Sequence, residues 1–513
     1  MGERIAFIFF VLLTNFGISQ EMHIAGGGNL FISSQDALYI NNNVTINASG
    51  SLTVNSDATS SGSLLISGTI TGAITYQRYV NENGNGWHLL SLPVTTQSIN
   101  DFATNVNASN SIATNGNRYA IAAYNNANSS GNRWEYYDTT TAPSAGDFVS
   151  GKGYSMKRTV GGLLTFGGAM SSSNVLSSLT TASGTHYWSC IGNPFPSYLP
   201  VNNNANGTNV LGQNLSVLDP SFAALYFWDG VQYVAVNQTS GATYLPPGQA
   251  FFVRAKSDNE SFTFSKSLTS HQIIADNFNR VTNTIPSVVI NLSNGSQNKS
   301  TEIKYLPNTT TGLDVGYDAG TYQDGAPIFS IDTHLVGDSV GVDFTIQCLP
   351  DNTYETLVVP LAVKATANQE LTFNATTSSI PEGVDVYLED RGANTFTKIN
   401  GSSYQITTET VLNGIGRFYL YTSENALSID DIIPLQTVNI YKTDNMTVRI
   451  TGLQDQGNTT MRMYSFTGKQ VFLHSFVGQN IQDITLPKNL NTGIYVATII
   501  SKKGNHTKKL IIE

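Results

Sequence analysis

The segment WHLLSLP at residues 87–93 decides how we divide the chain, because a second segment of the same form, WSCIGNP, follows at residues 188–194. Each segment has a tryptophan, five further residues and a proline. An Ala-x-Tyr sequence ends 37 residues after the first tryptophan and 38 after the second, and a glycine turn before an aromatic residue begins 64 and 60 residues after them. Three matches in the same order predict an internally duplicated β-sandwich over residues 76–272.

Each repeat reads as a tryptophan-bearing strand that ends at a proline turn, a hairpin, and a strand entered through a glycine turn. In the second repeat Asp229-Gly230 has the left-handed turn chemistry of a tight hairpin. The first repeat has a longer loop at residues 125–133. We expect the two repeats to pair face to face, with Trp188 and Cys190 on one face of a core strand.

The other segments of the body also have the pattern of strands. Residues 20–75 place apolar pairs such as Leu30 and Ile32 between Asn, Ser and Gly, which predicts a few β-solenoid rungs or a β-meander. Residues 285–425 alternate apolar and polar residues between turns, which predicts a second β-sandwich. Only 12% of residues are charged, whereas Tyr and Phe number 24 each, and this composition favours strands and turns. The predicted fold class is all-β and multidomain.

The N-terminus has the pattern of an export signal. Glu3 and Arg4 precede a run of nine apolar residues, and Gly17 and Ser19 suit positions −3 and −1 of a cleavage site. Nine residues are too few to cross a bilayer core of about 30 Å as a helix. We therefore predict a signal peptide at residues 1–19 and a mature chain that begins at Gln20.

Charge divides the chain into two parts. Residues 436–513 contain nine basic and four acidic residues, a net charge of +5, so the remainder carries −10 − 5 = −15. Phosphate contacts need clustered Lys and Arg, and the acidic body therefore argues against nucleic acid as a partner.

The last segment carries a recognisable set of motifs. It reads VNIY at 438–441, MRMYSFTGKQV at 461–471, GIYV at 493–496 and KKLII at 508–512. This order closely resembles the type A C-terminal sorting domain of the bacterial type IX secretion system. The resemblance covers residues 436–513, and the body is more loosely similar to non-catalytic regions of large surface proteins that use the same export route.

The resemblance implies a small Ig-like sandwich that directs its cargo across the outer membrane, to the cell surface or the extracellular space. It also implies two partners, the type IX secretion machinery and a sortase-like processing enzyme that leaves the cargo released or attached to surface lipopolysaccharide. The residues that carry the sorting motif are Gly468, Gly493, Ile494, Tyr495, Lys508 and Lys509.

A search for catalytic motifs leads us to expect no catalytic site and no cofactor. The seven histidines are scattered without metal-binding spacing, and the chain has no Gly-x-Ser-x-Gly elbow and no phosphate loop. Cys190 has His186 and Trp188 nearby, but a small buried hydrophobic residue is the better interpretation than a thiol nucleophile. We interpret Cys190 and Cys348 as separate buried thiols.

One acidic segment is a candidate calcium site. Asp314, Asp318 and Asp324 lie among glycines and offer the oxygen ligands that Ca²⁺ accepts. Their spacing does not match an EF-hand, so a turn-rich loop is the alternative interpretation.

Aromatic residues of the two hairpins are the candidate binding residues, because rigid rings stack on sugars at small entropic cost. We expect alternation along the strands to send half of these rings into the core. Three hypotheses follow: a structural or adhesive surface protein, a carbohydrate-binding module, and, third, an extracellular hydrolase with dispersed acids. The candidate glycan-stacking residues are Trp134, Tyr136, Tyr226, Trp228 and Tyr233.

Overall fold

A computed structural model describes most of residues 21–513. The described ranges are residues 21–82, 85–107, 112–273, 285–325, 327–337, 341–354, 357–423, 438–444, 446–453, 457–465, 468–488, 490–501 and 504–512. The predicted signal peptide at residues 1–19 lies outside them. Within these ranges, no helix has the length and apolar character that a bilayer crossing requires.

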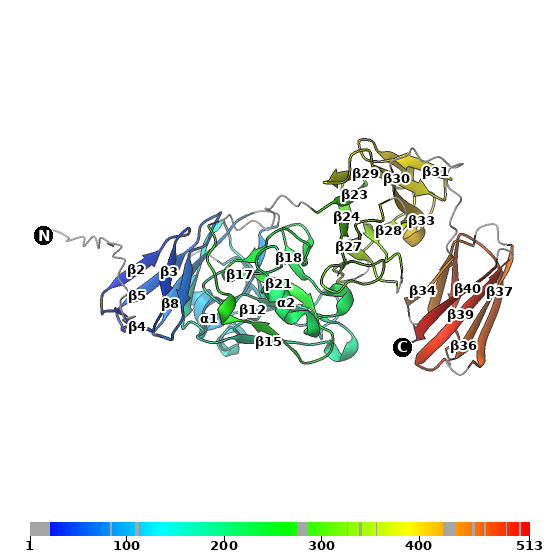
Figure 1. The fold of residues 1–513 in the computed structure, drawn as a ribbon. Coiled ribbons are helices and arrows are strands. Elements are labelled where there is room, and N and C mark those ends of the chain that lie inside the picture. The colour runs from blue at the N-terminus through cyan, green and yellow to red at the C-terminus, as the bar shows by residue number, and fades with distance from the viewer. Residues whose placement is uncertain are drawn as a thin grey trace.

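Strands dominate every part of the structure, as the all-β prediction requires (Figure 1). The solenoid region, drawn in blue, lies at one end of the molecule, and the orange and red C-terminal strands lie at the other. The α-helices are short, with α1 at Ile99–Asp101 and α2 at Val210–Asn214.

The N-terminal strands form solenoid rungs, because they stack in parallel and a meander would pair them antiparallel. Val44, Leu52 and Leu64 point inward and are buried. The three stacks are β1 (Met22–Ile24), β4 (Val44–Ile46) and β7 (Ile70–Thr71); β2 (Asn29–Ile32), β5 (Ser51–Asn55) and β8 (Ile74–Val80); and β3 (Ala37–Ile40) with β6 (Ser63–Ile66).

The solenoid continues directly into the first repeat. Strand β8 pairs in parallel with β5 and antiparallel with β14 (Gly162–Gly168). One hydrophobic core runs without interruption from Ile24 to Met170. The boundary that we predicted between residues 75 and 76 therefore falls inside a strand, because so few rungs bury their apolar face only against a neighbour.

The two repeats form sheets with the same strand order. Across each sheet, the first strand of the repeat is followed by its fourth strand, then its second and then its third. The pair Leu90 and Tyr154 in the first sheet corresponds to Ile191 and Phe251 in the second. The strands are β9 (Trp87–Leu90), β11 (Arg118–Tyr124), β12 (Trp134–Asp138) and β13 (Tyr154–Lys157), and β16 (Trp188–Gly192), β18 (Leu225–Trp228), β19 (Tyr233–Val236) and β21 (Ala250–Arg254).

Backbone bridges at equivalent positions join the two sheets. Leu90 bridges Gln249, and Lys152 bridges Ile191. Each sheet keeps its own apolar core on one face, and the opposite faces share an aromatic cluster that contains Trp188. Smaller strands complete the region: β10 (Thr114–Asn115), β15 (Val175–Leu179), β17 (Leu199–Pro200), β20 (Tyr244–Leu245) and β22 (Glu260–Phe264).

In the part of residues 285–425 that the structure describes, eleven strands form one sheet. The sheet curls around a single core and nearly closes where Ala375 N donates to Ile399 O at 2.8 Å. It is therefore one curled sheet rather than two stacked ones. The strands are β23 (Ser287–Ser293), β24 (Asn298–Leu306), β25 (Ala319–Gly320), β26 (Ser330–Thr333), β27 (Phe344–Pro350), β28 (Val359–Ala365), β29 (Glu370–Ser378), β30 (Asp385–Asp390), β31 (Thr395–Lys398), β32 (Tyr404–Thr407) and β33 (Leu412–Ser423).

The C-terminal strands form two sheets around a separate core that includes Val448, Met461 and Ala497. One sheet contains β34 (Asn439–Asp444), β35 (Thr447–Thr451) and β38 (Ile481–Thr485), and the other contains β36 (Asn458–Ser465), β37 (Gln470–Val477), β39 (Gly493–Ser501) and β40 (Gly504–Ile512).

Candidate functional site

An aromatic cluster lies where the two repeats meet the curled sheet of residues 285–425. The ring centroid of Tyr322, which follows β25, lies 4.6 Å from that of Trp188 and 4.1 Å from that of Tyr233. Ala319, Ile346 and Cys348 of the curled sheet belong to the same buried cluster. We call this cluster the aromatic junction; its rings are Tyr124, Trp134, Trp188, Tyr226, Trp228, Tyr233, Phe252 and Tyr322.

The predicted Asp229-Gly230 turn positions two of these rings. The Asp229 carboxylate accepts hydrogen bonds from the backbone N–H groups of Val231 and Gln232, both at 2.8 Å, and Gly230 has a φ of +103°. Trp228 and Tyr233 therefore stand directly opposite each other on β18 and β19, with ring centroids 5.1 Å apart.

The equivalent hairpin of the first repeat supplies a second group of rings. Trp134 pairs with Tyr124 across β12 and β11, and Tyr136 contacts Trp87 edge to face at 5.7 Å. The side chain of Tyr136 is 39% exposed. The duplication thus brings aromatic residues from two distant parts of the sequence to one side of the body.

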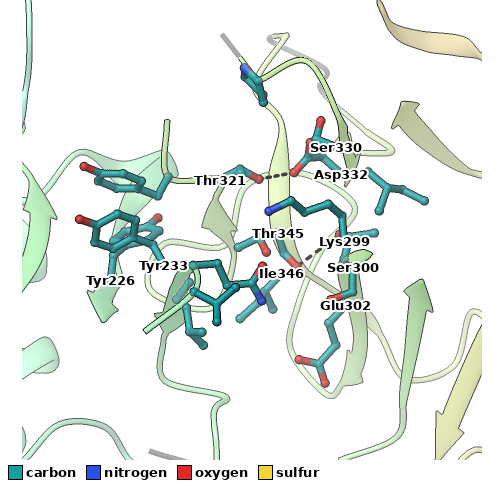
Figure 2. Close-up of a pocket in the computed structure, with 18 of the residues that line it drawn as sticks. Tyr226, Tyr233, Lys299, Ser300, Glu302, Thr321, Ser330, Asp332, Thr345 and Ile346 are labelled. Carbon is teal, nitrogen blue, oxygen red and sulfur yellow. Dashed lines mark hydrogen bonds between the residues drawn. The ribbon is translucent and has the colours of Figure 1, made fainter. Parts of the chain in front are cut away.

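The larger of two adjoining pockets, with a volume of about 690 Å³, opens between the second hairpin and the curled sheet. Figure 2 shows Tyr226 and Tyr233 on one side of it and Glu302, Ser330 and Asp332 on the other. One wall is therefore aromatic, and the other, the polar wall, carries these polar side chains beside apolar ones such as Phe329 and Ile331.

The smaller pocket, of about 240 Å³, lies over the first hairpin. It is lined by Trp87, Trp134 and Tyr136, together with Trp228 and Tyr233. Trp228 and Tyr233 line both pockets, so the two are neighbours. Three of the four tryptophans of the chain thus line one pocket or the other.

All five candidate glycan-stacking residues line at least one of these pockets. Tyr226 is the most buried, at 1% exposure, and its hydroxyl donates to Gly320 O at 2.6 Å. Sequence reasoning missed Trp87 and Tyr322 as lining residues. The position of Trp87 in the repeat was the available signal, whereas Tyr322 has no local signal because its ring partners, Phe252 among them, are 70 or more residues away.

A buried carboxyl group closes the polar wall. Asp332 is 2% exposed, and Thr321 Oγ1 donates to its Oδ1 at 2.5 Å. Burial, and then the neighbouring charge of Asp343, raise the pKa of Asp332 to about 7. Burial would also raise the pKa of Asp343, but contacts with His334 Nε2 at 2.8 Å and Lys364 Nζ at 2.6 Å hold that pKa below its usual range.

The candidate calcium ligands make separate contacts. Asp318 accepts backbone hydrogen bonds from Asp314 N and Cys348 N, both at 2.7 Å, and Asp324 forms an ion pair with Arg133. In the described ranges, no group of three or more His, Cys, Asp or Glu side chains is arranged to hold a metal ion.

Cys190 and Cys348 are both unpaired and buried in the aromatic junction. Burial raises the pKa of each thiol, which opposes thiolate formation. His186 contacts Tyr124, with Nε2 2.7 Å from the hydroxyl oxygen, and burial lowers its pKa to about 4. These contacts fit packing groups rather than a nucleophile and its base.

The residues of the sorting motif lie on β39, on β40 and in one turn. Gly493, Ile494 and Tyr495 at the start of β39 pair with the last residues of β40, and Ala497 and Val496 pair with Lys508 and Lys509. Gly468 has a φ of +82° between β36 and β37, a conformation that favours glycine.

Comparisons with known families agree with this division of the chain. The model of a secretion system C-terminal sorting domain matches residues 442–513. The protein is therefore a type IX secretion substrate that crosses the outer membrane to the cell surface or the extracellular space. A comparison with curated proteins gives no match. The model of a domain of unknown function, DUF8693, matches residues 9–421, which is most of the chain. The chain belongs to the DUF8693 family and carries a C-terminal sorting domain behind that region.

Proposed function

We propose that this protein is a non-catalytic adhesion protein of the cell surface whose body binds glycans at the aromatic junction. The observation that carries the proposal is the pair of adjoining pockets with aromatic walls, which share Trp228 and Tyr233. Both pockets lie in the body and not in the sorting domain, so binding and export belong to different parts of the chain.

Aromatic rings held on strands suit the recognition of sugars. One face of a pyranose ring is apolar and stacks on Trp or Tyr, and a ring already fixed by its neighbours loses little conformational entropy on binding. Trp228 and Tyr233 are fixed by cross-strand pairing, and Tyr322 packs against Tyr233.

The dimensions of the site favour an oligosaccharide. A volume of about 690 Å³ lies within the range of roughly 300–1,000 Å³ that is typical of ligand pockets. The smaller pocket shares Trp228 and Tyr233 with the larger one, so an extended chain of sugars would contact both pockets. Export makes such a ligand an extracellular one, and retention through surface lipopolysaccharide would turn binding into adhesion.

A glycan array probed with the mature full chain tests the proposal. We expect saccharide binding that is lost in Trp228→Ala and weakened in Tyr136→Ala. Tyr39→Ala is the matched control, because Tyr39 is 64% exposed on the solenoid and lines neither pocket. Cell adhesion that persists without any saccharide binding would contradict the glycan part of the proposal.

The non-catalytic part has its own test. Incubation of the protein with each bound saccharide should leave the saccharide intact when the mixture is analysed by chromatography. Turnover that a single Asp or Glu substitution abolishes would overturn this part and identify a hydrolase.

A further inference from the structure

We propose that Lys364 and Asp343 of the curled sheet become joined by an isopeptide bond, which forms inside the folded protein with Asp332 as the proton carrier. The bond is a covalent modification of the chain and uses none of the aromatic rings assigned to glycan binding. Its failure would therefore leave the proposed function untouched.

The first observation is the close contact between the two reacting groups. Lys364 Nζ lies 2.6 Å from Asp343 Oδ2, and the two side chains are 17% and 12% exposed. His334 Nε2 lies 2.8 Å from Asp343 Oδ1, and Gln323 Nε2 donates to Oδ2 at 3.2 Å, so both oxygens of the carboxyl group are held. Well-oriented groups that are held together can reach effective concentrations of about 10⁵–10⁸ M.

The second observation is a buried carboxyl group beside this contact. Strand β26 lies between β28, which carries Lys364, and β27, which Asp343 precedes. Ser330 of β26 is directly opposite Lys364, so their side chains share one face of the sheet, and Asp332, two residues further on, shares it as well. The Lys364 side chain therefore crosses β26 on the face where Asp332 lies. The charges of Asp343 and Lys364 both act on the pKa of Asp332.

Asp332 is suited to carry a proton. It is 2% exposed, and burial, followed by the charge of Asp343, raises its pKa to about 7. Hydrogen bonds from Thr321 and Ser330 fix its carboxyl group in place. A carboxyl group with a pKa close to the working pH can both give and take a proton, which amide formation requires.

The reaction balances without any other reactant. One proton moves from the Lys364 ammonium group to the Asp343 carboxylate across their contact, and the free amine Nζ then forms a bond with Asp343 Cγ. Because a carboxylate only accepts hydrogen bonds, His334 Nε2 carries a proton, and this N–H stabilises the negative charge that develops on Oδ1. Asp332 gives its proton to the Oδ2 hydroxyl, which leaves as water, and takes a proton from the nitrogen. The products are one amide and one water molecule.

The bond closes a covalent loop from residue 343 to residue 364. It holds β28 to the start of β27 even when the hydrogen bonds of β26, the strand between them, open. Hydrogen bonds between strands break and reform, whereas an amide does not. A surface protein that holds a cell against mechanical force would gain from this bond.

The mass of the denatured mature full chain tests the proposal first. We expect it to be lower than the mass of the sequence by one water molecule. Lys364→Arg, which keeps the positive charge beside Asp343, should restore the full mass of its own sequence. A wild-type chain with the full mass of its sequence would overturn the proposal.

Trypsin digestion then locates the bond. After Lys304 the next two sites of cleavage are Lys364 and Arg391, and an acylated lysine is not cleaved. We expect a peptide of residues 305–391 that lacks one water, in place of the separate peptides 305–364 and 365–391. An aspartate that dehydrates to a succinimide would lose the same water but leave Lys364 open to cleavage, and that result would overturn the proposal.

A second lysine–aspartate pair provides the matched control. Lys398 Nζ lies 2.7 Å from Asp385 Oδ1, but these side chains are 48% and 29% exposed. The groups that lower the pKa of Asp385 are Lys398 and Asn400, and neither is an acid. We expect normal cleavage after Lys398, and Lys398→Arg should still lack one water relative to its own sequence.

Asp332→Asn tests the proton carrier separately. The variant keeps Lys364 and Asp343 but loses the group that moves the proton, so we expect its full mass and normal cleavage after Lys364. Circular dichroism checks that it folds, and the wild-type mass decides the proposal if it does not. A bond that forms to the wild-type extent in folded Asp332→Asn would overturn the role of Asp332.

Discussion

The molecule has two junctions of opposite character. At the aromatic junction, rings from both repeats and from the curled sheet form one buried cluster. Between the curled sheet and the sorting domain, Tyr441 packs on Ala362 and Ile415, and a few polar contacts surround it. Arg449 Nη1 donates to Asn413 O at 2.5 Å, and Asn480 Nδ2 donates to Gly416 O at 3.0 Å.

The difference shows which parts depend on one another. The body shares apolar cores across its predicted boundaries, so its pieces stabilise each other. The sorting domain has its own core and docks through one buried tyrosine, Tyr441, and through hydrogen bonds to backbone carbonyls of the body. We therefore expect the body to act as one unit and the sorting domain to be separable from it.

The largest expected effect comes from deletion of residues 436–513. The truncated protein should fold, because its cores are intact, but should stay in the periplasm. Cell fractionation and protease accessibility of whole cells measure its location, with the full-length protein as control. Normal appearance of the truncated protein outside the cell would contradict the sorting assignment.

Trp188→Ala should break the aromatic junction itself. Trp188 is 1% exposed, and its ring centroid lies 4.8 Å from that of Tyr226 and 4.6 Å from that of Tyr322. Removal of a buried tryptophan costs about 3–5 kcal/mol of unfolding free energy. Chemical denaturation followed by circular dichroism measures the loss. A loss below about 1 kcal/mol would mean that the junction does not stabilise the body.

The stability of the protein should also depend on pH through Asp332, which lines the larger pocket. The pKa of Asp332 is about 7 in the folded protein and about 3.9 in an unfolded chain. Between these values the folded state holds the proton more tightly, so this contribution to stability is present below about pH 4 and is lost as the pH rises to about 7.

Asp332→Asn removes this titration. The wild-type protein should lose stability relative to the variant as the pH rises from about 4 to 7, by at most about 1.4 kcal/mol per pH unit. Paired denaturation curves across this range measure the difference. A constant difference between the two proteins would show that Asp332 has no raised pKa.

We expect the smallest effect at the junction between the curled sheet and the sorting domain. Arg449→Ala removes the contact with Asn413 and the ion pair with Asp483, whose atoms are 2.7 Å apart. Because Asp483 is 44% exposed, we expect a loss of no more than about 1 kcal/mol in the sorting domain and no shift in the unfolding of the body. Differential scanning calorimetry separates the two transitions. A large shift of the body transition would show that the body depends on this junction for its stability, as it does on the aromatic junction.

Local patterns predicted much of the fold. Apolar pairs such as Leu30 and Ile32 marked the solenoid rungs, and Asp229-Gly230 marked the hairpin that places Trp228 opposite Tyr233. Both features depend on period-2 alternation and turn chemistry within a few residues, which a sequence shows directly.

The parts that the sequence did not predict depend on distant contacts. Strand β8 continues the solenoid sheet into the first repeat through β14, more than 80 residues later. Ser330 and Asp332 reach the hairpin rings only because the curled sheet packs there, about 100 residues from Trp228. No local sequence pattern predicts that these distant segments meet.

Tryptophan fluorescence during titration with an array-identified neutral oligosaccharide tests the central claim most directly, because three of the four tryptophans line the two pockets. We predict a saturable change in intensity and wavelength that disappears in Trp228→Ala and persists in Tyr39→Ala. Saccharide binding with unchanged fluorescence, or an unaltered titration in Trp228→Ala, would place the ligand elsewhere and contradict glycan binding at the aromatic junction.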